Sequence, residues 1–260
     1  MAQLRVSTGG AIATITLDNP GQRNAVTAGM WQQFGPILAG LAADAAVKVV
    51  VVRGAGGDFS AGADIRDLER ILHDRTAGDG GYVTAAENAI ASFPKPTIAA
   101  IEGYCVGGGW EIAGACDIRI AAESSTFGVT PARIGIIYPL SGIERLVSIA
   151  GPAVARYLLF SGELVDATRA YELGLLTAVV TQQKFEDEVA ALAATLASRS
   201  QLSIHAMKEI IGLIEAGGNG LAAAGARWDR ELAASDDAAI GVAAFVAGQR
   251  PEFTWTGPIT

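Results

Sequence analysis

The stretch I-A-A-I-E-G-Y-C-V-G-G-G-W-E-I-A-G-A-C-D-I-R-I, at Ile98–Ile120, decides the fold that we expect for this chain. Its apolar start follows Pro94 and Pro96, which is typical of a buried strand. The three glycines Gly107–Gly109 permit a sharp turn, and Trp110–Ala115 then reads as a helix. The pattern therefore predicts a strand, a glycine turn and a helix N-terminus in succession.

This predicted turn favours a negatively charged ligand, because a helix N-terminus presents unpaired N–H groups and the positive end of the helix dipole. Glu111 follows Gly108 by three residues, which places its carboxylate about one helical turn further along the same face. These residues alone leave two interpretations open. One is an oxyanion site beside an acid/base, and the other is a tight packing turn with a solvated glutamate.

The composition indicates a folded protein without affinity for nucleic acid. The 260 residues are 50% hydrophobic and carry a net charge of −8, with no basic stripe to meet phosphates. Cys105 and Cys116 form no disulfide framework and match no metal motif. The first residues lack an apolar signal core, and no stretch reaches the roughly 18 apolar residues of a membrane span. We expect a cytoplasmic protein without a membrane partner.

The rest of the chain predicts an α/β body. Leu4–Ser7 and Ile12–Leu17 alternate in hydrophobicity around two glycines, which indicates a β-hairpin. Thr27 is a suitable N-cap for a helix running to about Ala42. Val47–Arg53 is a second buried strand, and it leads into a second glycine-rich loop.

The second half of the chain becomes helical. We expect a polar surface loop at His73–Gly81, a last strand at Leu175–Val180, and apolar helical stripes that a neighbouring subunit would cover. The expected helices lie near Val83–Phe93, Ser141–Ala150, Pro152–Phe160, Phe185–Arg199, Ile204–Glu215, Leu221–Ala234 and Asp236–Ala247.

Several common catalytic motifs are absent. Both glycine-rich turns lack the sixth-position glycine of the dinucleotide fingerprint, where Phe59 and Ile112 stand instead. There is no phosphate-binding G-K-[ST], no G-x-S-x-G and no H-E-x-x-H. His73 and His205 are far apart and expected at the surface, so we predict no histidine-based metal centre.

Five segments of the sequence occur in a fixed order. They are L-D-N-P-G-Q-R-N-A-V-T at Leu17–Thr27, D-F-S-A-G-A-D-I at Asp58–Ile65, G-Y-C-V-G-G-G-W-E-I-A-G-A-C-D at Gly103–Asp117, F-G-V-T-P-A-R-I-G at Phe127–Gly135 and A-x-E-x-G-L-L at Ala170–Leu176. Together they resemble the enoyl-CoA hydratase/isomerase (crotonase) family over nearly the whole chain.

The resemblance implies a crotonase-like (ClpP/crotonase) α/β fold, a spiral of β-β-α turns with a C-terminal helical trimerisation region. Such trimers often pair into hexamers. We expect the spiral core with the acyl-CoA site in residues 1–195 and the helical oligomerisation region in residues 196–260. The implied substrate is an acyl-CoA thioester, so that coenzyme A is part of the substrate and no separate cofactor is expected.

Carried onto this sequence, the family's oxyanion hole falls on the backbone N–H groups of Ala63 and Gly108. Two converging N–H groups suit the charge that collects on a thioester oxygen as an enolate forms. An alternative role for Asp64 is a helix N-cap without ligand contact. A weaker correspondence puts Arg250 and Phe253 against coenzyme A across a subunit interface. The coenzyme A contacts that the resemblance implies are Arg23, Ala25, Ala61, Asp64, Ile65 and Arg66.

One departure from the family bears directly on the chemistry. Family hydratases use two glutamates to activate water; Glu111 matches the first, but the second falls on Pro131. Glu144, at the start of a later helix, is a candidate substitute, although we expect it at the surface. The resemblance still implies hydration of a 2-enoyl-CoA with Glu111 as acid/base, but without the second carboxylate that hydratases and isomerases use.

Thr130, Pro131 and Tyr138, in T-P-x-x-x-G-x-x-Y, are similar to the methylmalonyl-CoA decarboxylase branch. A malonyl-type substrate would lose CO₂ to give the same enolate, with Tyr138 orienting the carboxylate or delivering a proton. However, Ala63 stands where that branch has a histidine. Two further interpretations stay open: Tyr138 is a buried aromatic whose hydroxyl bonds to the backbone, or the chain binds acyl-CoA without turnover.

Overall fold

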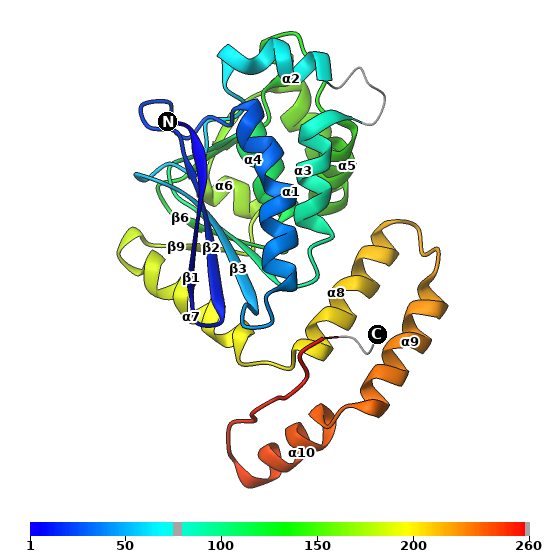
Figure 1. The fold of residues 1–260 in the computed structure, drawn as a ribbon. Coiled ribbons are helices and arrows are strands. Elements are labelled where there is room, and N and C mark those ends of the chain that lie inside the picture. The colour runs from blue at the N-terminus through cyan, green and yellow to red at the C-terminus, as the bar shows by residue number, and fades with distance from the viewer. Residues whose placement is uncertain (75–79, 258–260) are drawn as a thin grey trace.

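The computed structural model describes residues 1–74 and 80–257, which form an α/β body with helices projecting from one end (Figure 1). Part of the predicted loop His73–Gly81, residues 75–79, lies outside the described residues. The ends of that loop prediction were wrong, because helix α2 (Leu68–Asp74) and helix α3 (Gly81–Ala91) extend into it.

The larger sheet has the strand order β1-β2-β3-β4-β6-β9. Its first two strands form the predicted hairpin, with Gly9 opposite Ile12, and every later neighbour is parallel. The strands are β1 (Gln3–Gly9), β2 (Ile12–Asp18), β3 (Val49–Gly54), β4 (Thr97–Ile101), β6 (Ile118–Ala122) and β9 (Ala178–Val180).

The parallel strands of this sheet are buried on both faces. Val50 and Val52 of β3 pack into the main core with helices α1 (Ala28–Ala43) and α3, whereas Val49 and Val51 face helix α7 (Phe185–Ala197). Strands covered on both sides favour continuous apolar runs over alternation. This explains why V-V-V-V in the sequence is a central strand.

The predicted strand, turn and helix of the opening stretch contain one strand more than expected. After β4 the chain turns at Gly103, whose φ is 54°, and forms β5 (Tyr104–Val106) before helix α4 (Gly108–Ala115). A Cβ on Gly103 would lie 2.3 Å from Asp58 Oδ1, so only glycine fits this crossing. The unit is thus a β-β-α turn, as a crotonase-like spiral requires.

Strand β5 belongs to a second, smaller sheet with the order β5-β7-β8. β7 (Thr126–Gly128) runs parallel to β5, and β8 (Leu164–Asp166), which the sequence did not predict, runs antiparallel to β7. A helix of one and a half turns, α6 (Ala167–Glu172), follows β8.

Two helices in the body follow their sequence signals closely. Thr27 caps α1, since its Oγ1 accepts a hydrogen bond of 3.2 Å from the Met30 amide. The predicted pair at residues 141–150 and 152–160 forms one segment, α5 (Leu140–Ser161), broken at Gly151, where φ is 77°. The break explains why the sequence indicates two helices.

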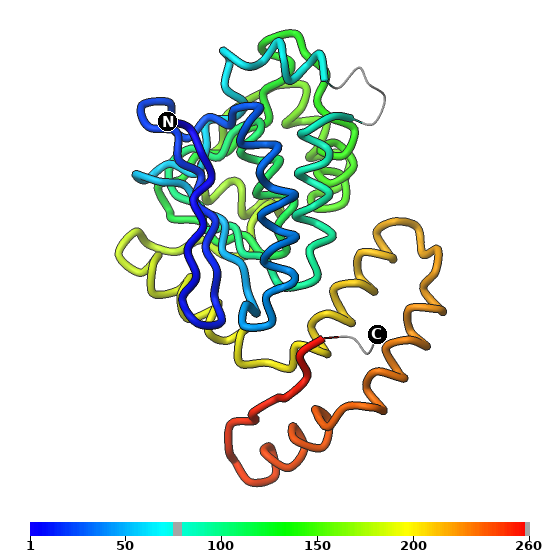
Figure 2. Tube along the Cα trace, viewed as in Figure 1, coloured from blue at the N-terminus to red at the C-terminus, as the bar shows by residue number. Residues whose placement is uncertain are grey.

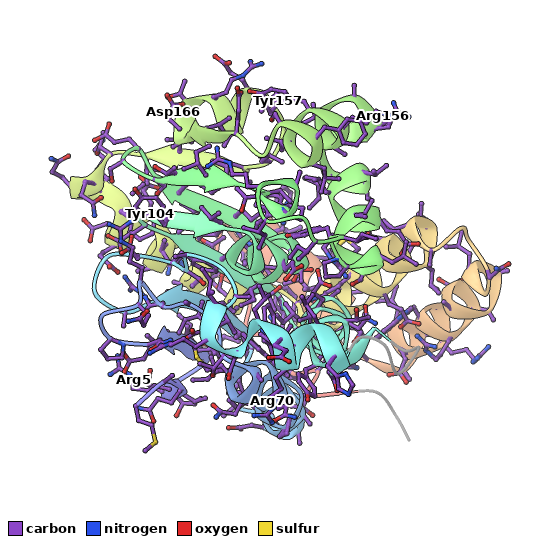
Figure 3. All side chains as sticks on the ribbon, turned by 90° about the horizontal axis from the view of Figure 1, so that it is seen from above. Arg5, Arg70, Tyr104, Arg156, Tyr157 and Asp166 are labelled. Atoms are coloured by element: carbon purple, nitrogen blue, oxygen red, sulfur yellow. The ribbon has the colours of Figure 1, made fainter. Side chains whose placement is uncertain are left out.

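The four C-terminal helices occur where they were predicted. After α7 come α8 (Gln201–Glu215), α9 (Leu221–Ala234) and α10 (Asp237–Ala247). The last three stand apart from the body in Figure 1, and α8 and α9 also lie beside it in the view from above in Figure 3. The expected boundary between residues 195 and 196 falls in the last turn of α7, and a division into two domains stays a prediction.

The segment after α10 turns back toward α8 (Figure 2). Asp237 anchors it, because its Oδ1 accepts hydrogen bonds from the amides of Thr254 and Trp255, at 3.1 and 3.2 Å. His205 of α8 packs edge-on against the Trp255 ring, with centroids 5.1 Å apart. The expectation that His205 lies at the surface was therefore wrong, because the returning segment partly buries it.

No helix in the described ranges is both long enough and apolar enough to cross a membrane.

Candidate active site

Three loops meet at the N-terminus of α4. Isolated parallel bridges join Val26 to Ala63 and Ser60 to Cys105. The approach is close, since a Cβ on Gly109 would lie 2.5 Å from the Ser60 carbonyl oxygen. The two glycine-rich turns of the sequence are therefore in direct contact, although some forty residues separate them.

The amide groups of Ala63 and Gly108 lie side by side in these two turns. A Cβ on Gly108 would lie 3.1 Å from the Ala63 nitrogen, and one on Gly62 would lie 3.6 Å from the Gly108 nitrogen. Within residues 1–74 and 80–257, no turn or loop hydrogen bond is donated by either amide. Their neighbours are bonded instead: the Val26 amide donates to Gly62 at 2.7 Å, and the Asp64 amide donates to Val26 at 2.9 Å.

Glu111 occupies the first turn of α4, immediately beyond these amides. Its side chain is buried, with 5% of the residue exposed. Its own amide donates to the Gly107 carbonyl at 3.0 Å, which closes the first turn of the helix. The solvated glutamate considered from the sequence is thus excluded, because Glu111 is buried in the first turn of the helix that begins at Gly108.

Tyr138 lies against the same turn. Its hydroxyl donates to the Gly107 carbonyl oxygen at 2.9 Å, and the residue is 5% exposed. Burial, together with the negative charges of Glu111 and Glu87, raises the pKa of the Tyr138 phenol well above its ordinary value. This is the buried aromatic with a backbone-bonded hydroxyl that the sequence left open.

Asp64 caps the 3₁₀ helix η1 (Ile65–Asp67), since its Oδ1 accepts from the Arg66 amide at 3.0 Å. The Arg66 guanidinium also clasps this carboxylate, with Nε 2.9 Å from Oδ1 and Nη2 2.6 Å from Oδ2. The hydrogen bonds from Arg66 lower the pKa of Asp64 to about 2. The N-cap role of Asp64 is confirmed, whereas its contact with coenzyme A stays a prediction, and Arg66 remains largely exposed.

Arg23 lies on the first loop, in a left-handed conformation with φ at 46°. Its guanidinium stacks 4.4 Å above the Tyr104 ring and is 4.0 Å from the Asp58 carboxylate. The next residue, Asn24, holds this loop against the second one by donating to the carbonyls of Ala55 and Asp58 at 2.7 and 2.6 Å. The Arg23 guanidinium is thus held by the Tyr104 ring and the Asp58 carboxylate but remains exposed to solvent.

The other predicted coenzyme A contacts lie on the same pair of loops. The Ala61 amide donates to the backbone carbonyl of Arg23 at 2.9 Å. The Ala25 carbonyl accepts from the Asn19 side-chain amide at 2.7 Å. Ile65 extends into solvent, 79% exposed. The sequence-predicted contacts are therefore neighbours in space.

Thr130 and Pro131 belong to a third segment of the chain that contacts the Gly107 turn. They follow β7, whose Gly128 carbonyl accepts from the Gly107 amide at 2.9 Å. Pro131 is buried and begins the 3₁₀ helix η3 (Pro131–Arg133). A further 3₁₀ helix, η4 (Gln182–Lys184), lies immediately before α7.

Arg250 and Phe253 belong to the segment after α10, and their contact with coenzyme A across an interface stays a prediction.

Sequence reasoning missed Glu87, which is fully buried in α3. Its carboxylate accepts a short hydrogen bond from the Ser141 hydroxyl, and its charge acts on Tyr138. The signal was present, because Val83, Glu87 and Ile90 share the buried face of this helix at helical spacing. A charged residue in such a stripe indicates a second carboxylate near the site.

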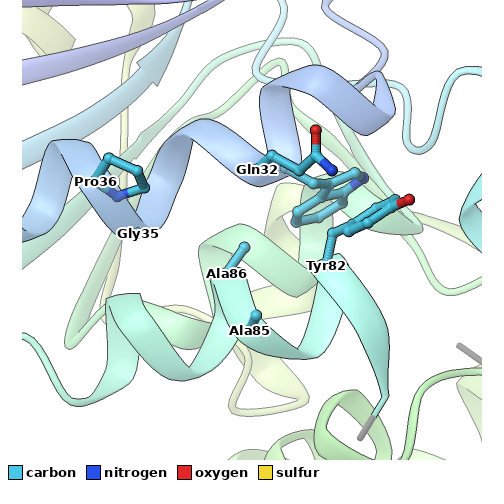
Figure 4. A pocket seen from close by; sticks show the side chains of 7 residues that line it. Gln32, Gly35, Pro36, Tyr82, Ala85 and Ala86 are labelled. Carbon is cyan, nitrogen blue, oxygen red and sulfur yellow. The ribbon is translucent and has the colours of Figure 1, made fainter. Parts of the chain in front are cut away.

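Trp31 was also missed, and it connects the site to a groove. The groove, of about 310 Å³, lies between α1 and α3 (Figure 4) and is lined by Trp31, Gln32, Gly35, Pro36, Tyr82, Ala85 and Ala86. The Cζ2 edge of the indole faces Gly108, since a Cβ there would lie 3.0 Å away. Among the described residues, Trp31 Nε1 has no hydrogen-bond acceptor.

A β-β-α spiral with two glycine turns that bring free amides together defines a crotonase fold. A family model described as enoyl-CoA hydratase/isomerase matches residues 7–256. The chain belongs to the enoyl-CoA hydratase/isomerase family.

Curated relatives agree with this assignment. A protein of Rhizobium meliloti named probable enoyl-CoA hydratase is 33% identical over 255 residues, covering 96% of this chain and 97% of its own. Carnitinyl-CoA dehydratase of Escherichia coli K12 is 34% identical over 209 residues, covering 80% and 79%.

Solved structures are similar along nearly the whole chain. A crystal structure of an enoyl-CoA hydratase/isomerase family member has a TM-score of 0.93 at 39% identity, covering 99% of this chain and 98% of that one. An enoyl-CoA hydratase/carnithine racemase from Magnetospirillum magneticum has a TM-score of 0.89 at 33% identity, covering 98% and 96%.

Proposed function

We propose that this protein hydrates a 2-enoyl-CoA, or dehydrates the corresponding 3-hydroxyacyl-CoA. The observation that carries the proposal is the side-by-side placement of the Ala63 and Gly108 amides with the buried Glu111 one helical turn away. Amides fixed in this way stabilise a developing thioester oxyanion without reorganising, and each such donor typically contributes about 3–4 kcal/mol to the transition state.

The proposed reaction uses Glu111 twice. Its carboxylate accepts a proton from water while the water oxygen bonds to C3, and the double-bond electrons move to the thioester oxygen between the two amides. The protonated Glu111 then returns the proton to C2 and regenerates the carboxylate. No separate cofactor takes part, since coenzyme A belongs to the substrate.

The site departs from the two-glutamate arrangement that the resemblance implies, because the second of those two sequence positions is Pro131. Pro131 carries no titratable group, and Glu144 lies exposed on α5, as expected. Glu87 is a second buried carboxylate in this region, and its negative charge contributes to the raised pKa of Tyr138. We therefore propose Glu111 as the acid/base and Glu87 as a contributor to the local negative charge.

The coenzyme A moiety is proposed to lie across the first two loops. The exposed guanidinium groups of Arg23 and Arg66 offer positive charge to its phosphates on an otherwise acidic protein. In this proposal Asp64 acts by holding Arg66 in place through its carboxylate.

Decarboxylation of a malonyl-type thioester is the second candidate, because Tyr138 is present. The observed hydrogen bond disfavours it, since the Tyr138 hydroxyl already donates its one proton to the Gly107 carbonyl. A third candidate, binding without turnover, does not account for a buried carboxylate in the first turn of α4.

We further propose that the C-terminal helices assemble trimers, or hexamers made of two trimers. Apolar side chains there lie open in the single chain: Val242, Phe245 and Val246 are 66%, 87% and 82% exposed. A contiguous apolar surface of this kind marks a protein interface. A cytoplasmic location also stays a prediction.

The test is a panel of enoyl-, 3-hydroxyacyl- and malonyl-CoA thioesters analysed by mass spectrometry, with wild type, Glu111→Gln and Glu144→Gln. We expect crotonyl-CoA to gain one water, with at least an approximately hundredfold loss for Glu111→Gln and no loss for the exposed control. Release of CO₂ that survives Glu111→Gln would replace hydration with decarboxylation. Tight binding without any product would leave the protein an acyl-CoA carrier.

A further inference from the structure

The peptide unit between Gly107 and Gly108 supplies one of the two proposed oxyanion donors. In a trans peptide the C=O and N–H groups point in opposite directions. Whatever holds the Gly107 carbonyl therefore also decides where the Gly108 N–H points. Two donors meet that carbonyl: the Glu111 amide at 3.0 Å and the Tyr138 hydroxyl at 2.9 Å.

This peptide unit needs such a restraint. It is flanked by glycine on both sides, and Gly107 adopts φ 53° and ψ −113°, a conformation that side-chain-bearing residues rarely take. Rotation of the peptide plane therefore meets little steric resistance from its own residues. A rotated plane would turn the Gly108 N–H away from the Ala63 amide.

We propose that Tyr138 is a positioning residue that locks the Gly107–Gly108 peptide so that its N–H faces the thioester oxygen. The hydrogen bond at the carbonyl also polarises the peptide and strengthens its N–H as a donor. This inference rests on the proposed function, and it gives Tyr138 a role through the backbone and not through proton transfer to substrate.

The fold holds the Tyr138 ring in place for this task. Tyr138 lies just before α5, and a Cβ on Gly142 in the first turn of that helix would lie 2.8 Å from the ring atom Cε1. Burial and the charges of Glu111 and Glu87 keep the phenol protonated, so that it remains a donor at neutral pH.

The second oxyanion peptide is held in the same manner. The Gly62 carbonyl, in the peptide unit that carries the Ala63 N–H, accepts a hydrogen bond of 2.7 Å from the Val26 amide. Each oxyanion donor is thus backed by a donor on the opposite side of its own peptide unit. Two side chains donate to these carbonyls: the Ser60 hydroxyl to Gly62 at 3.5 Å and the Tyr138 hydroxyl to Gly107 at 2.9 Å. The Tyr138 bond is the shorter one, and mutation can remove its hydroxyl without altering the backbone.

The experiment compares wild type with Tyr138→Phe and with the exposed control Tyr171→Phe on α6. We expect Tyr138→Phe to lower kcat about tenfold with KM within about twofold, because the lost interaction acts on the transition state. The second readout is the absorption of a bound arylacryloyl-CoA, whose band moves to the red as its carbonyl is polarised. We expect a smaller red shift in Tyr138→Phe and no change in the control.

Gly142→Ala provides an independent variant that keeps the hydroxyl but displaces the ring, and it should show the same split between kcat and KM and the same reduced red shift. Unchanged kcat and absorption in both variants would overturn the inference. A fall in kcat with the red shift intact would also overturn it, because the hydroxyl would then act in proton transfer. If wild type itself binds the probe without a red shift, the proposed oxyanion site fails, which is a distinct result.

Discussion

At the residue scale, the site depends on positions where a side chain would not fit. A Cβ on Gly108 would lie 3.0 Å from Trp31 Cζ2 and 3.1 Å from the Ala63 nitrogen. These distances are shorter than ordinary van der Waals contact, and the added methyl would occupy the space between the two amides. Gly108 is therefore required mainly because it has no side chain. The space that a Cβ would occupy is the one that the thioester oxygen is proposed to fill.

Gly108→Ala should lower kcat for the hydrated thioester by at least about a hundredfold, because the methyl group displaces the oxyanion from both donors. The matched control is Gly40→Ala in α1, where a Cβ meets nothing within 4 Å. The control should keep full activity and gain up to about 1 kcal/mol of stability from the better helix residue. Steady-state kinetics and thermal melts measure both; an active Gly108→Ala enzyme would contradict the proposed position of the oxyanion.

At the element scale, β5 and α4 hold the two cysteines in the interior. Cys105 lies in β5 and Cys116 follows α4, and both thiols are buried and unpaired. Burial raises the pKa of Cys116 to about 12 and raises the pKa of Cys105 well above its ordinary value. These elements thus keep the thiols as packing groups, not as nucleophiles.

We expect neither thiol to react with an aromatic disulfide reagent at pH 8 while the protein is folded, and both to react after denaturation. The thiol form dominates at that pH because burial disfavours the thiolate. Intact-mass measurement of the labelled protein counts the modified residues. Rapid labelling of one cysteine in the native protein would show that β5 or the end of α4 opens readily.

Helix α8 carries a partly buried titratable group, His205. Burial, aided by the positive charges of Lys95 and Lys208, lowers the pKa of His205 from 6.5 to about 4. His205 therefore takes up a proton near pH 6.5 in the unfolded chain but only near pH 4 in the folded protein. The contribution of neutral, partly buried His205 to the free energy of unfolding is complete above pH 6.5. It decreases progressively as the pH falls from 6.5 to about 4.

We predict that the melting temperature falls by about 2–4 °C more between pH 7.5 and pH 5 in wild type than in His205→Phe. Phenylalanine keeps an edge-on contact with Trp255 but cannot take up the proton. Parallel melts of the two proteins across this range isolate the histidine from other titrating groups. Equal pH dependence would mean that His205 is already accessible to protons in the folded protein.

At the scale of the whole molecule, the helices after α7 project from the body and leave apolar side chains open (Figure 1). Polar contacts tie their base to the body, such as the hydrogen bond of 2.7 Å from Lys208 to Asp117. The single chain thus has a stable attachment for these helices but no cover for their outer faces. A further copy of the chain provides such a cover in our proposal.

Phe245→Glu combined with Val246→Lys on α10 should convert the assembly into smaller species, because charges at the centre of an interface are costly to bury. Ala39→Glu, on the exposed side of α1, is the control and should leave the assembly unchanged. Light scattering after size-exclusion chromatography gives the mass directly. A wild-type protein that is monomeric would contradict the proposed trimer.

Local signals predicted much of this architecture. The Gly9-Gly10 hairpin, the Thr27 cap and the break at Gly151 follow from backbone preferences that act within a few residues. The strand β5 was missed because it depends on Gly103 crossing over Asp58, forty-five positions earlier in the chain. Contacts of this kind leave little trace in a short window of sequence.

For the candidate site, the sequence by itself determined the chemical groups available. It showed the two glycine-rich turns, the carboxylate of Glu111, and Pro131 at the position where the family's second glutamate is expected. Only the tertiary structure decided that the Ala63 and Gly108 amides lie together, that Asp64 clasps Arg66, and that the Tyr138 hydroxyl faces the Gly107 carbonyl. The physical reason is that residue identity sets what a group can donate or accept. Its partner and its burial arise only when distant segments pack into one core.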